Sequence, residues 1–226
     1  VVKEAAVIKI SEAMAFSSAA IIGCGVMTGY GSAVNTAKVT PGATCAVIGC
    51  GGVGLNVIQG CRIAGATKII AIDLSEERLK QAEIFGATHF IKATKDDLDF
   101  INMRQEVRDL SDGRGADYAF ECTAVPALGA APLALIRNSG VAIQASGIEQ
   151  KVNFDCELFE WDKIYINPLY GQCQPKRDFP RLQTLYSQGK LLLDELLTRT
   201  YTLDELSMAF DDLLAGRNAK GVILFE

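Results

Sequence analysis

The sequence lacks an excess of positive charge, an unbroken apolar run and the paired cysteines of a metal or redox motif. Its 226 residues carry 22 Lys and Arg against 27 Asp and Glu, a net charge of −5. A surface for nucleic acid or anionic membrane needs clustered positive charge, so we expect neither partner. Apolar residues make up 49% and charged residues 22%, which excludes disordered, collagen-like and coiled-coil chains.

The cysteines indicate free thiols. They number seven, which is odd, and contain no C-x-x-C pair. Several lie within apolar runs, where cysteine behaves as a small hydrophobic residue. Free thiols are typical of a reducing compartment, and we find no signal peptide at the start of the chain. We therefore expect a cytoplasmic protein rather than a disulfide scaffold.

Two stretches without a charged residue, 13–37 and 39–61, need testing as membrane spans. A spanning helix uses about 20 predominantly apolar residues. Both stretches are interrupted by glycine and by Ser, Thr or Asn, and the second also contains Pro41. We therefore expect buried, loop-rich globular segments.

The length corresponds to about one and a half domains at ~150 residues each. From Thr44 onward, short strands that are continuous apolar runs alternate with helices, as in a parallel sheet covered on both faces. We predict an α/β fold, a Rossmann doubly wound parallel sheet. The expected strands are 44–48, 68–72, 89–91, 118–122, 141–145 and 163–167, and the expected helices are 53–64, 75–85, 100–110 and 127–136, with a turn at 138–140. The alternation then ends, and a helix (179–188), an extended segment (199–202), a helix (203–215) and a strand (221–225) follow.

The first strand-to-helix turn contains the motif G-x-G-x-x-G, as Gly49-Cys50-Gly51-Gly52-Val53-Gly54. The first glycine permits the tight turn, the second lets the backbone approach a pyrophosphate, and the third lets helix and strand pack closely. The helix N-terminus then offers free N–H groups to the phosphates. The motif predicts a dinucleotide site.

An acid supports this prediction. Asp73 ends the second expected strand, about 20 residues beyond the last glycine, where an acid binds the ribose hydroxyls. A carboxylate repels a 2′-phosphate, so it favours NAD over NADP. Arg78, one helical turn further on, could reach the ribose or a phosphate and weaken that preference. The alternative interpretation is a simple tight turn, with Asp73 as a strand-end cap.

Two further strings indicate a family. Residues 23–32 read GCGVMTGYGS, and the tail runs from YTLDEL at 201–206 to KGVIL at 220–224. With AVIGCGGVGLNVIQG and AIDLSEERL, they resemble the zinc-dependent alcohol dehydrogenases of the medium-chain family, in the branch that includes glutathione-dependent formaldehyde dehydrogenase. The resemblance covers essentially the whole chain. It implies hydride transfer between a small-molecule alcohol or aldehyde and NAD at a zinc site.

The resemblance also implies roles for particular residues. Cys24 matches a ligand of the catalytic zinc, and Thr28 matches a residue that packs near the nicotinamide. Arg78 stands where many members have Lys, and Lys220 where many have an Arg that binds a cofactor phosphate. The segment 145–147, Ala-Ser-Gly, stands where the family contacts the nicotinamide. The implied cofactor-binding set is Thr28, Gly49, Gly51, Gly52, Val53, Gly54, Asp73, Arg78 and Lys220, with Cys24 and Thr28 catalytic and Cys24 on the metal.

The resemblance further implies that the first part of a GroES-like catalytic domain is missing. That part supplies a Cys and a His ligand of the zinc, the hydroxyl and His of the proton relay and, in many members, a four-cysteine lobe for a structural zinc. The start at Val1 rather than Met agrees with this expectation. We expect residues 1–26 and 169–226 to be remnants of the catalytic domain and 27–168 to be the NAD-binding Rossmann domain, a fragment inactive by itself.

Two alternative functions remain open at this point. One is a zinc-free NAD(P)H reductase of the same superfamily, against which Cys24 and the GCGVMTGYGS string argue. The other is a non-catalytic NAD-binding module, which the truncated chain would be by itself. Because family members associate through the edge of the cofactor-domain sheet, we expect a homodimer formed around 163–167, with a tetramer as the alternative.

Three other features have a structural interpretation. Tyr186 and Lys190 match the Y-x-x-x-K pair of short-chain dehydrogenases, but the glycine spacing of that family is absent. His89, the single histidine, is expected at the start of a strand in the middle of the sheet, away from the glycine loop. Glu121 ends the fourth expected strand, and we interpret it as a hydrogen-bonded strand-end acid rather than part of the nicotinamide cleft.

Overall fold

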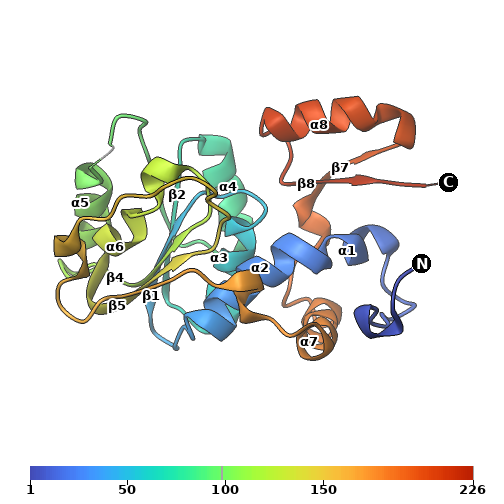
Figure 1. The fold of residues 1–226 in the computed structure, drawn as a ribbon, viewed down its shortest axis with the longest axis horizontal. Helices are drawn as coiled ribbons and strands as arrows, with labels where there is room; N and C mark the ends of the chain where they lie inside the picture. The colour runs from blue at the N-terminus through green and yellow to red at the C-terminus, as the bar shows by residue number, and fades with distance from the viewer. Residues whose placement is uncertain (98, 226) are drawn as a thin grey trace. The chain divides into compact units, whose positions relative to one another are not determined.

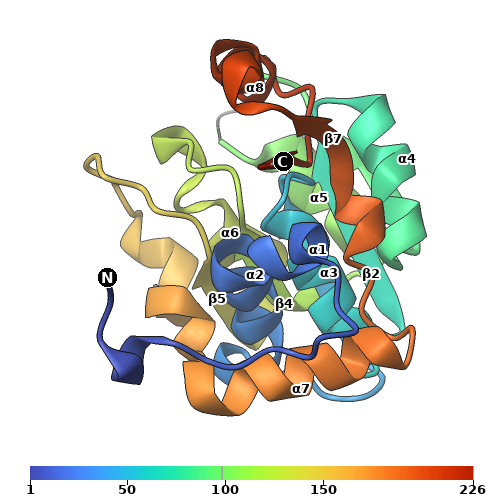
Figure 2. The same ribbon diagram turned by 90° about the vertical axis from the view of Figure 1, so that its right-hand side faces the viewer.

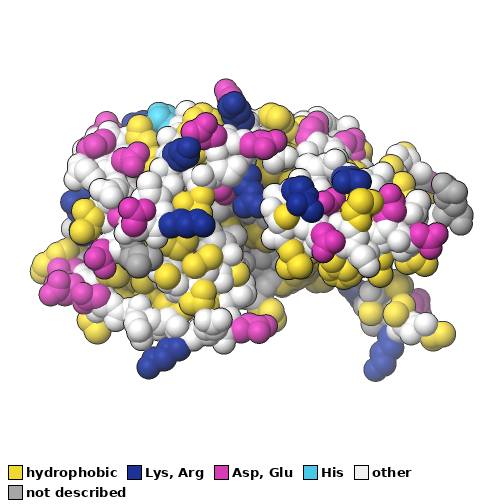
Figure 3. All heavy atoms as spheres, turned by 90° about the horizontal axis from the view of Figure 1, so that it is seen from above, with side chains coloured by type: hydrophobic (Ala, Val, Ile, Leu, Met, Phe, Trp, Pro, Cys, Tyr) yellow, Lys and Arg dark blue, Asp and Glu magenta, His cyan; other side chains and the backbone are white. Residues whose placement is uncertain are grey.

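The computed structural model describes residues 1–97 and 99–225, which form two compact units (Figure 1). Unit 1 consists of Val1–Met27 and Cys173–Glu226, and unit 2 is Thr28–Gln172. Within the described residues, no helix combines the length and apolar composition that crossing a bilayer requires. On the face shown in Figure 3, Lys and Arg side chains are interspersed with Asp and Glu.

Unit 2 is built on one parallel sheet of six strands. Its order is β3-β2-β1-β4-β5-β6, so the chain reverses its direction of travel across the sheet after β3 and continues on the other side of β1. Ile48, the last residue of β1, pairs with Ile72 on β2 and with Glu121 on β4. The carboxyl ends of these strands therefore meet at the switch point, where open α/β sheets bind ligands. The strands are β1 (Thr44–Ile48), β2 (Lys68–Asp73), β3 (His89–Lys92), β4 (Ala116–Glu121), β5 (Ile136–Gln144) and β6 (Ile164–Ile166).

Helices cover both faces of this sheet, which confirms the predicted Rossmann fold. α3 (Gly54–Ile63) and α4 (Glu76–Phe85) pack together on one face, and α5 (Ile101–Asp109) and α6 (Ala131–Leu135) pack together on the other (Figures 1 and 2). β1 is buried along its whole length, as a strand covered on both sides must be. The Ser75 hydroxyl accepts from the Arg78 N–H at 3.4 Å and so caps α4, which ends at Phe85 and is followed by Gly86 in the left-handed conformation.

The stretch 13–37, which was predicted to be loop-rich, is mostly helical, so that prediction was wrong. α1 (Phe16–Ala20) and α2 (Met27–Gly31) alternate with π-helical turns at Ile22–Val26 and Ser32–Thr36. Gly29 explains part of the difference, because a Cβ there would lie 2.5 Å from the Val53 carbonyl oxygen. Glycine in this segment allows close contact between α2 and the start of α3.

Other predicted elements are shifted. The expected turn at 138–140 is an irregular stretch within β5, because the pairing with β4 shifts there and Ser139 has a φ of +56°. α6 begins only at Ala131, since Pro126–Leu128 forms a separate 3₁₀ turn. β3 is an edge strand, so the prediction that His89 lies in the middle of the sheet was wrong.

Unit 1 joins the beginning of the chain to its end. The Ser18 hydroxyl donates to Asp194 Oδ1 at 2.6 Å, and the Ser11 N–H donates to Gln183 Oε1 at 2.9 Å. β7 and β8 are parallel neighbours connected through α8. The elements are α7 (Pro175–Ser187), β7 (Leu197–Tyr201), α8 (Leu206–Leu214) and β8 (Lys220–Ile223). Further 3₁₀ turns among the described residues are Glu4–Ala6, Cys156–Phe159, Asp194–Leu196 and Leu203–Glu205, whereas Leu169–Gln172 is kinked, with Tyr170 and Gly171 in the left-handed conformation.

Candidate cofactor-binding site

The glycine loop connects the end of β1 to the start of α3. Gly49 has a φ of +89°, a conformation that residues with a Cβ rarely adopt. At Gly54 a Cβ would lie 1.8 Å from the Gly49 carbonyl oxygen, so this position tolerates only glycine without a shift of the backbone. A Cβ on Gly51 would meet no atom within 4 Å. Gly49 and Gly54 therefore build the turn, and Gly51 leaves open space beside it.

The loop presents unpaired donors at the start of α3. Within the described part of the chain, the backbone N–H groups of residues 51–54 have no hydrogen-bond partner. The carbonyl groups of the loop are hydrogen-bonded: the Leu55 N–H donates to the Gly51 carbonyl at 2.9 Å, and Asn56 Nδ2 donates to the Gly52 carbonyl at 2.7 Å. Free N–H groups at the positive end of a helix dipole are suited to bind an anion.

Asp73 connects β2 to this loop. The residue is 8% exposed; Oδ2 accepts from the Cys50 N–H at 2.8 Å, and Oδ1 accepts from the Ser75 N–H at 2.9 Å. Arg78 Nη1 lies 3.9 Å from Oδ2. Each carboxylate oxygen has two lone pairs, so Asp73 retains acceptor capacity for a ligand.

A cleft of about 620 Å³ opens between these groups, entirely within unit 2. Gly49 and Gly51 line it from the loop, and Asp73 and Arg78 from the end of β2 and the start of α4. Residues after β3 and β4 complete the lining. The other lining residues are Ile48, Ile72, Leu74, Ala93, Thr94, Lys95, Asp97, Met103, Cys122, Thr123, Val125, Ala127 and Leu128.

Two thiols beside the cleft are kept neutral. Burial, with the nearby Asp73 carboxylate, raises the pKa of Cys50 to about 12. Burial and the charge of Glu121 raise the pKa of Cys122 well above its ordinary value. A thiol rather than a thiolate is thus present at neutral pH, so neither side chain is an activated nucleophile.

The predicted site residues are divided between the units. The glycine loop, Asp73 and Arg78 come together at the cleft, whereas Thr28 is a half-buried residue of α2 outside the cleft lining. Cys24 is exposed in the π-helical turn Ile22–Val26 of unit 1, and Lys220 begins β8 in the same unit. Among residues 1–97 and 99–225, no three His, Cys, Asp or Glu side chains converge as metal ligands.

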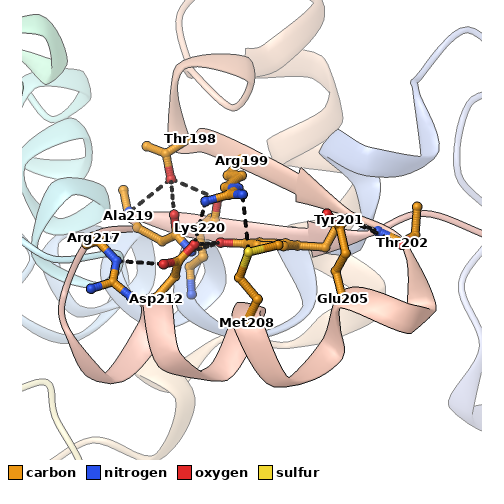
Figure 4. A network of polar contacts seen from close by, with 11 residues as sticks. Thr198, Arg199, Tyr201, Thr202, Glu205, Met208, Asp212, Arg217, Ala219 and Lys220 are labelled. Atoms are coloured by element: carbon orange, nitrogen blue, oxygen red, sulfur yellow. Dashed lines mark hydrogen bonds and ion pairs between the residues drawn. The ribbon is translucent and has the colours of Figure 1, made fainter.

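Lys220 belongs to a strand fixed by a polar network (Figure 4). Asp212, on α8, is its centre: Oδ2 accepts from Tyr201 Oη at 2.7 Å and from Arg199 Nη1 at 2.9 Å, and Oδ1 accepts from Arg217 Nε at 2.6 Å. The hydrogen bond from Tyr201 and that from Arg217 lower the pKa of the Asp212 carboxyl. Thr198 Oγ1 donates to the Lys220 carbonyl at 3.2 Å, which fixes β8 to β7.

Several cleft residues escaped the sequence prediction. Thr94, Lys95, Thr123 and Val125 follow β3 and β4, and only the strand order brings them beside the glycine loop. The available signal was the rule that carboxyl ends of parallel strands share one edge.

Tyr186 and His89, which were considered as catalytic candidates from the sequence, have ordinary hydrogen-bond partners. Tyr186 Oη, in unit 1, lies 3.0 Å from each oxygen of Asp194. His89 Nδ1 lies 2.8 Å from Thr88 Oγ1.

Comparison with known proteins identifies the family. Residues 52–170, more than half of the chain, match the family described as zinc-binding dehydrogenase. The chain belongs to the zinc-binding dehydrogenase family. This membership confirms the resemblance inferred from the sequence motifs.

Two relatives show how much of the family is represented. Alcohol dehydrogenase 6 of Rattus norvegicus is 39% identical over 229 residues, 99% of this chain and 60% of that protein. S-(hydroxymethyl)glutathione dehydrogenase of Paracoccus denitrificans is 35% identical over 233 residues, 100% of this chain and 61% of that protein. The chain thus spans about 60% of the length of these curated relatives.

Solved structures of the family share the fold. Benzyl alcohol dehydrogenase from Acinetobacter calcoaceticus has a TM-score of 0.87 at 29% identity, over 97% of this chain and 59% of that chain. An alcohol dehydrogenase zinc-binding domain protein from Burkholderia ambifaria gives the same score and identity, over 97% of this chain and 58% of that chain.

Proposed function

We propose that the chain carries the NAD-binding part of a zinc-dependent alcohol dehydrogenase. The whole enzyme would transfer a hydride between a small-molecule alcohol or aldehyde and NAD. The observation that carries the proposal is the hydrogen bond from the Cys50 N–H to Asp73, which fixes an acid and a loop of free N–H groups beside one cleft. The names of the relatives, both dehydrogenases, support the reaction class.

The groups of unit 2 fit NAD. The N–H groups of residues 51–54 would donate to the pyrophosphate, into the space left by Gly51. The Asp73 carboxylate would accept from the adenosine ribose hydroxyls and repel a 2′-phosphate. When bound, NAD supplies the carbon that accepts or donates the hydride, while the chain orients it and excludes water.

The zinc is a different case. A catalytic zinc uses three protein ligands and an open position, and the described residues of this chain do not provide that set. In the whole enzyme we propose that Cys24 contributes one thiolate, that Thr28 packs near the nicotinamide and that Lys220 binds a cofactor phosphate. Residues 1–26 and 169–226 would belong to the catalytic domain, and 27–168 to the NAD-binding domain.

A second candidate function applies to the chain by itself. This candidate is an NAD-binding module without catalysis, because the groups that fit NAD all lie in unit 2. A zinc-free reductase of the same superfamily remains the third candidate. Zinc at one atom per full-length chain would support the dehydrogenase over both.

We further propose a homodimer in a reducing, cytoplasmic compartment. β6 ends the sheet of unit 2, and beside it Trp161 is 68% and Ile164 is 51% exposed, as a surface for a second copy would be. All seven cysteines are free thiols, which agrees with a reducing environment. Sedimentation that shows only monomers of the full-length protein would contradict the dimer.

Calorimetric titration of this chain with NAD and with NADP tests the central proposal. We expect NAD to bind more tightly, because Asp73 opposes a 2′-phosphate. Absence of NAD binding by a folded chain would overturn the proposal.

A further inference from the structure

Glu121, the last residue of β4, is a buried carboxylate without a cation. Its side chain is 0% exposed, more deeply buried than Asp73. In residues 1–97 and 99–225, no Lys or Arg forms an ion pair with it. A buried charge is tolerated only where hydrogen bonds replace its lost hydration. The donors to Glu121 therefore indicate what its charge stabilises.

The two carboxylate oxygens bind two different loops. Oε1 accepts from the Thr123 N–H and Thr123 Oγ1, both at 2.5 Å, and from the Ala124 N–H at 3.0 Å. Oε2 accepts from the Ser146 hydroxyl. The backbone carbonyl of Glu121 also accepts from Ala145 N–H at 2.9 Å and Ser146 N–H at 3.2 Å. One side chain thus connects the segment after β4 to the segment after β5.

The first of these loops, residues 122–125, forms a wall of the cleft. Thr123 and Val125 line the cleft, and a Cβ on Gly49 would lie 2.7 Å from Thr123 Cγ2, so the loop packs directly on the glycine turn. Ala124 has a φ of +61°, which costs energy for a residue with a Cβ. The hydrogen bond from its N–H to Glu121 Oε1 holds this strained turn in place.

The second loop, residues 145–147, follows β5 at the same edge of the sheet. Glu121 and Gln144 are register partners, so both loops leave the sheet side by side. A shift of Ser146 would therefore be transmitted through the carboxylate to Thr123.

We propose that Glu121 is a positioning residue of the cofactor cleft, whose two carboxylate oxygens fix loops 122–125 and 145–147 relative to each other and to the glycine turn. This role rests on the proposed binding of NAD. Glu121 does not line the cleft itself. It acts on the cofactor only through Thr123, Ala124 and Ser146.

A double-mutant cycle on NAD affinity tests the role. Thr123→Val and Ser146→Ala each remove one donor to Glu121, from opposite oxygens. Because the two donors share one carboxylate, we expect the double variant to differ from the product of the single effects on Kd by about fivefold. In a Glu121→Ala background the connection is absent, so the two effects should multiply.

Glu121→Gln keeps the test informative if Glu121→Ala does not fold. Its amide oxygen can accept from Thr123 and Ala124, while its NH₂ can donate to the Ser146 hydroxyl, which reverses to accept. We expect this variant to fold and to retain part of the coupling, with NAD affinity between those of wild type and Glu121→Ala.

Asp117→Asn is the matched control on the same strand. Asp117 lies at the other end of β4, where it accepts from Thr44 N–H at 2.8 Å and Arg137 Nε at 2.6 Å. We expect a lower Tm with unchanged Kd for NAD, since this acid only supports the fold. If the wild-type chain binds NAD but the Thr123→Val and Ser146→Ala effects show no coupling, the proposed role of Glu121 is overturned while the proposed function stands. A folded wild-type chain that does not bind NAD overturns the proposed function, and the role with it.

Discussion

Asp73 is hydrogen-bonded directly to the glycine loop, because its Oδ2 accepts from the Cys50 N–H at 2.8 Å. The acid that would bind the ribose thus also fixes the turn that would bind the pyrophosphate. Two contacts to one dinucleotide would then depend on a single carboxylate. This relationship leads to the first prediction.

Asp73→Ala should weaken NAD binding by roughly 10- to 100-fold, the effect of losing charge-assisted hydrogen bonds. It should also raise NADP affinity relative to NAD, because the charge that repels the 2′-phosphate is gone. Titration calorimetry with both cofactors measures this change. Glu76→Gln is the control: Glu76 is on α4 but forms a surface ion pair with Lys92. An unchanged preference in Asp73→Ala would contradict the ribose role.

Gly51→Ala and Gly54→Ala should separate binding from folding. At Gly54 the new methyl group meets the Gly49 oxygen, so we expect a loss of about 1–3 kcal/mol in unfolding free energy. At Gly51 the methyl enters open space that the pyrophosphate would fill. This variant should keep its Tm and lose at least about tenfold in NAD affinity, ~1.4 kcal/mol. Equal losses of Tm in both variants would show that Gly51 serves only the fold.

The thiols should differ in their rate of alkylation. Cys24 and Cys156 are exposed, whereas Cys50 is buried with its pKa raised to about 12. At pH 8 we expect iodoacetamide to modify Cys24 and Cys156 more than about tenfold faster than Cys50, Cys61 or Cys122. Mass spectrometry of peptides after timed quenching gives these rates. Rapid labelling of Cys50 in the folded chain would show that the glycine loop opens.

Asp212 should make the stability of unit 1 depend on pH. Because its pKa is lowered in the folded state, its contribution is complete above the ordinary aspartate value of 3.8 and disappears as the pH falls through the folded pKa. Asp212→Asn should remove this acid-dependent loss and lower the Tm at neutral pH. Hydrogen exchange of the β7 and β8 amides between pH 3 and 6 measures the local stability of unit 1, after correction for the intrinsic exchange rates. Asp211→Asn, at the exposed neighbouring position, should leave the profile unchanged.

The local parts of the site were predictable from the sequence. The Gly49 to Gly54 turn has fixed spacing between an apolar strand and a helix, and Asp73 ends the next strand, so short-range pattern suffices. Contacts that depend on strand order were not predictable. The hydrogen bond of Asp73 to Cys50 and the position of Thr123 on Gly49 require β1 to lie between β2 and β4.

The helical segment before the sheet shows why pattern reasoning failed there. Between Phe16 and Thr36 there is no charged residue, so no polar face reveals a helical period. Glycines that usually interrupt helices serve close packing here, as Gly29 does against Val53. The Asn-Ser-Gly sequence at 138–140 has turn composition, and it forms the irregular part of β5, where Ser139 has a φ of +56° and the register with β4 shifts.

The beginning and end of unit 2 lie against each other. A Cβ on Gly171 would be 2.6 Å from the Thr28 carbonyl oxygen and 2.7 Å from the Ser32 nitrogen. Unit 1 is split by this insertion, and its two pieces meet where Cys173 Sγ donates to the Met27 carbonyl at 3.3 Å. Loop closure between distant residues costs entropy, and a folded unit 2 would remove that cost from the formation of unit 1. Unit 1 should therefore fold second and unfold first, whereas unit 2 needs neither piece of unit 1 to bring its own ends together.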